Sequence, residues 1–139
     1  MKLTEYAEKF IGRPYVWGGD GSGKFGGGFD CSGFVLECLW ATGQYKGNDC
    51  TSKALCKALK KLGWTKVRSN NERAGDICFW GSTEDKITHV SIVFEKGSHI
   101  EAGGGGSSQT DFIEKRFVRD FASTLKDFCR LGRRQNYRD

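Results

Sequence analysis

One cysteine in this chain has neighbours that are typical of a thiol nucleophile. Residues 30–33 read Asp-Cys-Ser-Gly, and the apolar periodicity that follows predicts a helix over residues 32–42. Cys31 is therefore expected at a helix N-terminus, where the dipole and unpaired N–H groups favour thiolate over thiol. The same N–H groups can stabilise an oxyanion, and the small Ser32 and Gly33 leave room for a substrate. This pattern indicates attack of Cys31 on a carbonyl carbon.

The glycine-rich stretch before Cys31 also matches two phosphate-binding patterns. Gly21-x-Gly23-x-x-Gly26 has the spacing of a dinucleotide fingerprint, and Gly18-x-x-x-x-Gly23-Lys24 lacks only the final Ser or Thr of a P-loop. Both patterns require a buried strand before the loop and a helix that begins at it. Three consecutive glycines soon after the lysine disfavour such a helix start, and only a short extended piece precedes the loop. The sequence therefore favours a nucleophile over a phosphate site.

A cysteine nucleophile needs an imidazole partner, and the chain has two histidines. His89 lies in the most strand-like segment, residues 88–94, which would hold its ring rigidly. A turn and a returning strand over residues 98–102 would then place His99 and Glu101 on one face, within reach of His89. Glu101 is the stronger acceptor for an imidazolium, although an imidazole can also orient another imidazole. The orienting group is therefore Glu101 or His99.

The elements that must position these side chains follow from periodicity and turn residues. We predict helices over residues 3–11, 32–42 and 51–62, strands over 76–80, 88–94 and 98–102, and a closing strand over 127–131. Residues 111–123 fit neither pattern. Helices followed by strands predict an α+β fold in which N-terminal helices pack on an antiparallel β-sheet, as a single domain over residues 1–139.

Charge and cysteine usage limit the partners and cofactors. The net charge is +5, with late arginines at 130, 133, 134 and 138 that form either a solvated tail or a surface attracting an anionic cell wall. No nucleic-acid-binding module accompanies them, so we expect no nucleic-acid partner. Cys50 and Cys56 lack the close spacing of structural zinc ligands. We expect most of the six cysteines to be small buried residues, and no metal or cofactor.

The chain shows no targeting segment of a standard kind. No stretch approaches the roughly 20 apolar residues that a membrane span needs. Glu5 and Glu8 interrupt the N-terminal segment, which lacks the apolar centre of a signal peptide. If the protein acts outside a cytoplasm, we expect another route to take it there.

Four sequence blocks, in their order and spacing, resemble the NlpC/P60 cysteine peptidases. The blocks are GRPYVWGG at 12–19, DCSGFV at 30–35, AGDICFW at 74–80 and THVSI at 88–92. The resemblance spans about residues 1–105, and residues 128–130 resemble the last strand of some phage-type members. It implies a papain-like α+β core and hydrolysis of amide bonds in bacterial cell-wall peptides, often between D-glutamate and a diamino acid.

The resemblance also implies roles for individual residues. Cys31 matches the nucleophile and His89 the base, and the third family position falls on Glu101, where His, Asn or Gln is usual. Tyr15 matches a tyrosine that shapes the oxyanion site. Asp30 and Ser32 match positions that bind a free amino group of the peptide in many members, although an aspartate there can also cap a helix. Residues 20–28 form an insertion relative to the family, expected at the rim of the active site.

The implied substrate partner is a peptidoglycan peptide, and we expect the protein to act as a monomer. A compact wall hydrolase of this kind fits a phage lysis or tail enzyme, or an effector injected into rival bacteria. Two alternatives remain open at this point: an N-acetylmuramoyl-L-alanine amidase with the same Cys-His chemistry, and a non-catalytic wall-binding module in which Cys31 is inert.

Overall fold

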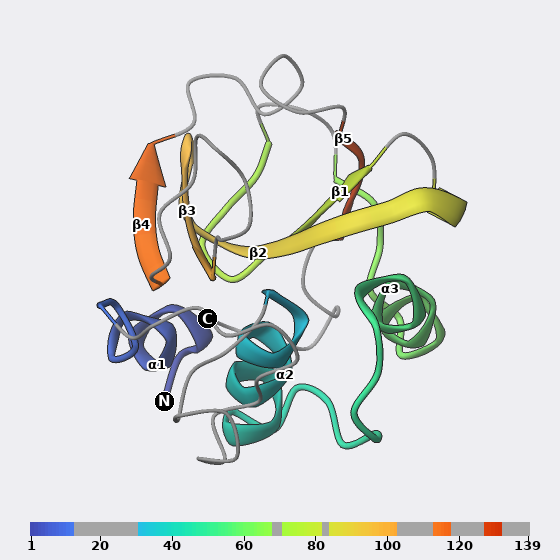
Figure 1. The fold of residues 1–139 in the computed structure, drawn as a ribbon, viewed down its shortest axis with the longest axis horizontal. Helices are drawn as coiled ribbons and strands as arrows, with labels where there is room; N and C mark the ends of the chain where they lie inside the picture. The colour runs from blue at the N-terminus through green and yellow to red at the C-terminus, as the bar shows by residue number, and fades with distance from the viewer. Residues whose placement is uncertain (13–30, 68–70, 82–83, 103–112, 118–126, 132–139) are drawn as a thin grey trace.

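The computed structural model describes residues 1–12, 31–67, 71–81, 84–102, 113–117 and 127–131 (Figure 1). Its helices are α1 (Leu3–Glu8), α2 (Cys31–Ala41) and α3 (Ser52–Lys61), with one 3-10 turn, η1 (Glu84–Lys86). Its strands are β1 (Ile77–Gly81), β2 (Ile87–Glu95), β3 (Ser98–Ala102), β4 (Ile113–Phe117) and β5 (Asp127–Leu131). The predicted α+β class is confirmed, and every predicted helix and strand is present.

The ends of α2 and α3 follow local rules that the sequence carries. Gly43 ends α2 because its backbone adopts a left-handed conformation (φ 77°), and the next N–H, that of Gln44, donates to the Leu39 carbonyl at 2.8 Å. The Thr51 hydroxyl caps α3 by accepting a hydrogen bond from the Ala54 N–H at 3.2 Å. These caps fix the lengths of the two helices that pack under the sheet.

The first helix is shorter than its apolar periodicity predicts. The pattern extends to Ile11, but α1 ends at Glu8 and continues only as turns up to Gly12 (φ 96°). Leu3 and Ala7 are buried, whereas Ile11 is 43% exposed. The predicted extent of this helix to residue 11 was therefore wrong, and Ile11 leaves the buried face because a side chain keeps its place on a helical face only while the helix continues.

The five strands form one antiparallel sheet in the order β4-β3-β2-β1-β5. The β2–β3 hairpin turns at Gly97 (φ 80°), as predicted. Strand β4 comes from the segment that fitted neither pattern and pairs with β3. Strand β5 is the predicted closing strand, and it pairs with β1 at the other edge of the sheet. The hairpin is thus held between neighbours on both sides.

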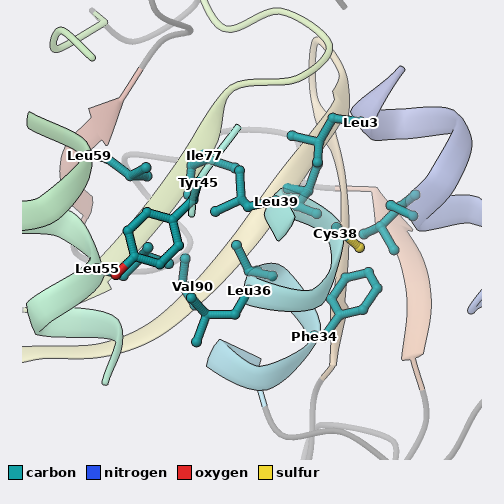
Figure 2. Close-up of a cluster of buried hydrophobic side chains, with 14 of the residues drawn as sticks. Leu3, Phe34, Leu36, Cys38, Leu39, Tyr45, Leu55, Leu59, Ile77 and Val90 are labelled. Atoms are coloured by element: carbon teal, nitrogen blue, oxygen red, sulfur yellow. The ribbon is translucent and has the colours of Figure 1, made fainter. Parts of the chain in front are cut away.

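One face of the sheet packs on the helices and forms the main core. Figure 1 shows α1, α2 and α3 on the same side of the sheet. Val90 and Ile92 of β2 and Ile100 of β3 are fully buried in this core. Figure 2 shows side chains that the helices contribute to it, among them Leu3 from α1, Phe34, Leu36 and Leu39 from α2, and Leu55 and Leu59 from α3. This packing fixes where the N-terminus of α2 lies.

Most of the intervening residues of the same two strands are polar. Because side chains alternate along a strand, Ser91, His99 and Glu101 belong to the face opposite Ile92 and Ile100. All three are buried. A small second apolar cluster contributes to this face and consists of Cys78, Trp80 and Val93. The hairpin therefore carries buried polar groups directly behind its apolar core face.

Candidate active site

Cys31 is the first residue of α2, so the prediction that it lies at a helix N-terminus is confirmed. Its side chain is half-buried and lies close enough to His89 to help raise the pKa of that imidazole. His89 is the third residue of β2, close to where that strand begins. The start of a helix and the start of a strand thus bring together a thiol and an imidazole that are 58 positions apart in the numbering.

Glu101 completes the group from the neighbouring strand. Its Oε2 lies 2.6 Å from His89 Nε2, the distance of a strong charge-assisted hydrogen bond. Since Nε2 is committed to the carboxylate, the other ring nitrogen, Nδ1, is the one left for Cys31. The side chains of His89 and Glu101 are only 14% and 3% exposed. The structure therefore brings together the three residues Cys31, His89 and Glu101, with the imidazole in the middle.

His99, the second candidate for orienting His89, lies behind Glu101. Its Nε2 is 3.7 Å from the same Oε2 that contacts His89. Its Nδ1 is 2.7 Å from the hydroxyl of Ser91. Glu101 therefore contacts His89 directly, whereas His99 lies next to the carboxylate of Glu101.

The environment of His89 strongly favours its protonated form. Burial by itself would lower the pKa of His89, but hydrogen bonds to Cys31 and Glu101 and the negative charge of Glu101 act in the opposite direction. The net effect raises the pKa of His89 from 6.5 to about 9. At neutral pH the ring is therefore an imidazolium that faces two acceptors.

The other described cysteines have different surroundings. Cys38, on the same helix as Cys31, is buried, and this burial together with the charge of Glu37 raises the pKa of its thiol. Burial, with a smaller contribution from Asp49, also raises the pKa of the Cys50 thiol. Both effects disfavour a thiolate. Among the described cysteines, the hydrogen bond to an imidazolium belongs to Cys31.

Of the three remaining residues of the predicted site, the structure describes only Ser32. Ser32 is half-buried in the first turn of α2, next to Cys31. Tyr15 and Asp30 lie outside the described residues, as does the glycine-rich segment 20–28. The roles expected for these residues remain predictions.

Sequence reasoning missed two residues behind the site. Trp80 of β1 donates its indole N–H to the Ser91 hydroxyl at 3.1 Å, and Ser91 in turn contacts His99. The signal for Ser91 was available, because Ser91 follows His89 by two positions on the same strand face. The contribution of Trp80 depends on β1 pairing with β2, which places Trp80 opposite His89.

The described segments contain neither a cluster of metal ligands nor a membrane-spanning helix. There, no group of three or more His, Cys, Asp or Glu side chains is arranged to hold a metal ion. Nor does any helix among those segments have the length and apolar character to cross a bilayer.

Comparison with known proteins decides the family. The model of the NlpC/P60 family matches residues 12–125. The chain belongs to the NlpC/P60 family. A curated relative, the gamma-D-glutamyl-L-lysine dipeptidyl-peptidase of Bacillus subtilis (strain 168), is 35% identical over 101 residues, which are 71% of this chain and 30% of that protein. The chain spans less than a third of the length of the first curated relatives that it matches.

Solved NlpC/P60 structures share this fold. The NlpC/p60 domain of the peptidoglycan hydrolase SagA superposes with a TM-score of 0.70 at 29% identity, covering 94% of this chain and 95% of that domain. RipD of Mycobacterium tuberculosis, described as a non-catalytic NlpC/p60 domain protein adapted to peptidoglycan binding, has a TM-score of 0.64 at 23% identity, with 96% and 98% covered. The shared fold therefore includes both a hydrolase and a non-catalytic protein, so activity must be argued from the site.

Proposed function

We propose that the protein is a cysteine endopeptidase that hydrolyses amide bonds in peptidoglycan stem peptides, between D-glutamate and the diamino acid. The observation that carries the proposal is the position of His89, which interacts with Cys31 and lies 2.6 Å from Glu101. This is the arrangement of nucleophile, base and orienting group that acyl transfer requires. The family relative that cleaves a gamma-D-glutamyl-L-lysine peptide supports the choice of bond.

The resting site would hold a protonated His89 between Glu101 and the sulfur of Cys31. With its pKa raised to about 9, His89 carries both ring protons at neutral pH and donates them to Glu101 and to the sulfur of Cys31. A thiolate, unlike a thiol, is the attacking species in cysteine chemistry. The carboxylate of Glu101 stabilises the imidazolium and holds the ring so that Nδ1 faces the sulfur.

The reaction would proceed through an acyl-enzyme. The Cys31 sulfur forms a bond to the carbonyl carbon of D-glutamate, and the carbonyl oxygen becomes an oxyanion beside the positive N-terminus of α2. When the tetrahedral intermediate collapses, the amide C–N bond breaks and His89 gives its proton to the departing amine. His89 then takes a proton from water, whose oxygen attacks the thioester. The C–S bond breaks to give the Cys31 thiolate and the D-glutamyl carboxylic acid, which loses its proton to solvent.

Substrate recognition involves residues next to the nucleophile. By family position, Ser32 and Asp30 would hold a free amino group of the stem peptide, and Tyr15 would contribute to oxyanion stabilisation. The position of Ser32 directly after Cys31 at the start of α2 supports this role. The inserted segment 20–28 would modify selection among wall peptides, and delivery to the wall by a phage or an injected effector remains a prediction.

Product mapping on purified peptidoglycan tests the proposal. Lysine-type and diaminopimelate-type walls are digested with the wild-type protein and with Cys31→Ala, and the fragments are identified by mass spectrometry. The proposal predicts a new free amine on the diamino acid, produced by the wild type only. A new free amine on L-alanine would instead identify an N-acetylmuramoyl-L-alanine amidase.

The non-catalytic alternative is separated by the same experiment. RipD shows that this fold also occurs in a protein described as non-catalytic and peptidoglycan-binding. If this chain were of that kind, wild type and Cys31→Ala would sediment equally with insoluble peptidoglycan and release no fragments from either wall. Circular dichroism of both proteins verifies that the substitution leaves the fold intact.

A further inference from the structure

We propose that His99 is a positioning residue that holds Glu101 in place for His89, and that Ser91 and Trp80 fix the orientation and proton of His99. This inference deepens the proposed hydrolase function and rests on it. It assigns a role to a second layer of buried polar groups that extends from β1 through β2 to β3.

The second layer is a continuous series of contacts. Trp80 Nε1 lies 3.1 Å from Ser91 Oγ, and Ser91 Oγ lies 2.7 Å from His99 Nδ1. His99 Nε2 lies 3.7 Å from Glu101 Oε2, and that oxygen lies 2.6 Å from His89 Nε2. The series therefore ends on the ring that contacts Cys31.

The direction of the hydrogen bonds follows from the one group that can only donate. An indole N–H has no acceptor capacity, so Ser91 Oγ accepts from Trp80. Ser91 is fully buried, and its own hydroxyl proton needs an acceptor. His99 Nδ1, at 2.7 Å, supplies it. His99 Nδ1 is then unprotonated, and the ring carries its single proton on Nε2.

This tautomer directs an N–H group at the carboxylate. The Nε2–H group of His99 lies 3.7 Å from Glu101 Oε2, beyond hydrogen-bond length, so it acts on this carboxylate as a nearby N–H dipole, whereas His89 contacts the same oxygen at 2.6 Å. The Glu101 side chain is only 3% exposed, and a buried carboxylate requires donors to stay ionised and oriented. One oxygen thus receives a hydrogen bond from the reacting His89 and the longer-range N–H dipole of the supporting His99.

Packing keeps the supporting ring in place. The Trp80 and His99 rings meet edge to face, with centroids 5.7 Å apart and planes at 63°. His99 itself is 3% exposed. The ring therefore has a fixed plane as well as a fixed tautomer. Both properties are needed for Nε2 to keep facing Glu101.

Two substitutions at position 99 separate the two halves of this role. In His99→Asn, the side-chain amide reaches about as far as the Nδ1 of histidine, so it keeps a partner for Ser91 but offers no donor to Glu101. In His99→Gln, the amide reaches about as far as Nε2 and keeps that donor. We expect kcat on peptidoglycan fragments to fall about tenfold or more in His99→Asn with little change in KM, and to be largely retained in His99→Gln.

Nitrogen-15 NMR of the imidazole rings gives a readout that does not depend on turnover. The chain has two histidines, so the His99 signals are those lost in His99→Asn. At pH 7 we expect His99 protonated on Nε2 only, in wild type and in Cys31→Ala alike, and we expect Ser91→Ala to remove this preference. Protonation of His99 on Nδ1 in the wild type would overturn the inference.

The two proposals fail in different ways. If the hydrolase function is wrong, the wild type releases no more fragments than Cys31→Ala, while the NMR arm still reports on the tautomer. If only the positioning role is wrong, Cys31→Ala is inactive but His99→Asn retains the kcat of the wild type. Equal losses of kcat in His99→Asn and His99→Gln would also contradict a role that depends on the Nε2 donor.

Discussion

The β2–β3 hairpin has two buried faces that differ in chemistry from one residue to the next. Val90, Ile92 and Ile100 pack into the apolar core above the helices. The intervening Glu101 belongs to the candidate active site, and Ser91 belongs to the polar layer behind it. Both faces are closed to solvent, so burial alone does not distinguish them. The difference lies in what each face contacts: one contacts helix side chains, and the other connects polar groups to Cys31.

This comparison shows how a small fold can hold a reactive group precisely. The apolar face anchors α2 against the sheet and thereby places its N-terminus, while the polar face of the same strands directs His89 toward Cys31. Because the strand period is two residues, a single hairpin does both. We therefore expect substitutions on the two faces to separate stability from activity.

The largest expected effect is on activity. Cys31→Ser keeps the size of the side chain but replaces the thiolate with a hydroxyl that is far less acidic, so we expect a loss of roughly 10³-fold or more in kcat/KM on wall fragments. The melting temperature should change little, because Cys31 is half-buried at a helix end. Kinetics and thermal denaturation on the same samples provide the check. Retained activity would exclude Cys31 as the nucleophile.

A substitution on the apolar face of the hairpin should lower stability and leave activity nearly unchanged. Ile92→Ala removes a fully buried side chain from the main core and should destabilise the protein by about 2–5 kcal/mol. At a temperature where the variant stays folded, its kcat should remain near that of the wild type. Urea denaturation measures the first quantity and fragment release the second. A large fall in kcat without a fall in stability would contradict the separation of the two faces.

A smaller effect on stability is expected from pH. The pKa of His89 rises from 6.5 to about 9 on folding, so the folded state binds this proton more tightly than the unfolded chain does. The resulting stabilisation is fully present below about pH 6.5 and is lost as pH rises through about 9. Urea denaturation across this range should show the fall. Glu101→Gln removes the negative charge that helps raise the pKa of His89, so stability should fall less steeply with pH in this variant. An equally steep fall would show that the pH dependence does not come from the His89–Glu101 interaction.

The smallest expected effect is on the stability of helix α3, which lies away from the polar face of the hairpin. Thr51→Ala removes the side-chain cap of α3, and we expect a loss of about 1 kcal/mol with no change in kcat. Thr51→Ser retains the hydroxyl and serves as the matched control. Chemical denaturation of the two variants should differ by that amount. A change in kcat would show that α3 influences the site, which the proposed division between the faces does not allow.

The sequence predicted much of the site because its key signals are local. The helix start at Cys31 and the alternation of His99, Ile100 and Glu101 depend on neighbouring residues, and both are confirmed. The turn at Gly97 follows from its freedom to adopt a positive φ. These features required no knowledge of which elements pack together.

The second layer could not be predicted in the same way. The contact between Trp80 and Ser91 depends on the pairing of β1 with β2, and that of β5 with β1 joins segments still farther apart in the chain. Periodicity identifies which face a residue occupies but not which strand lies beside it. For the same reason, β4 could not be assigned from residues 111–123 alone. These contacts and the assignment of β4 follow only from the pairing of strands in the folded sheet.

Selective alkylation tests the central claim, that His89 activates Cys31, most directly. Cys50 is an internal control, since it is also half-buried but burial raises the pKa of its thiol. Native protein is treated briefly with iodoacetamide at pH 7, and each cysteine is quantified by peptide mass spectrometry. We predict that Cys31 is modified well before Cys50 and that His89→Ala removes this preference. Equal rates for the two cysteines, or an unchanged Cys31 rate in His89→Ala, would contradict the account.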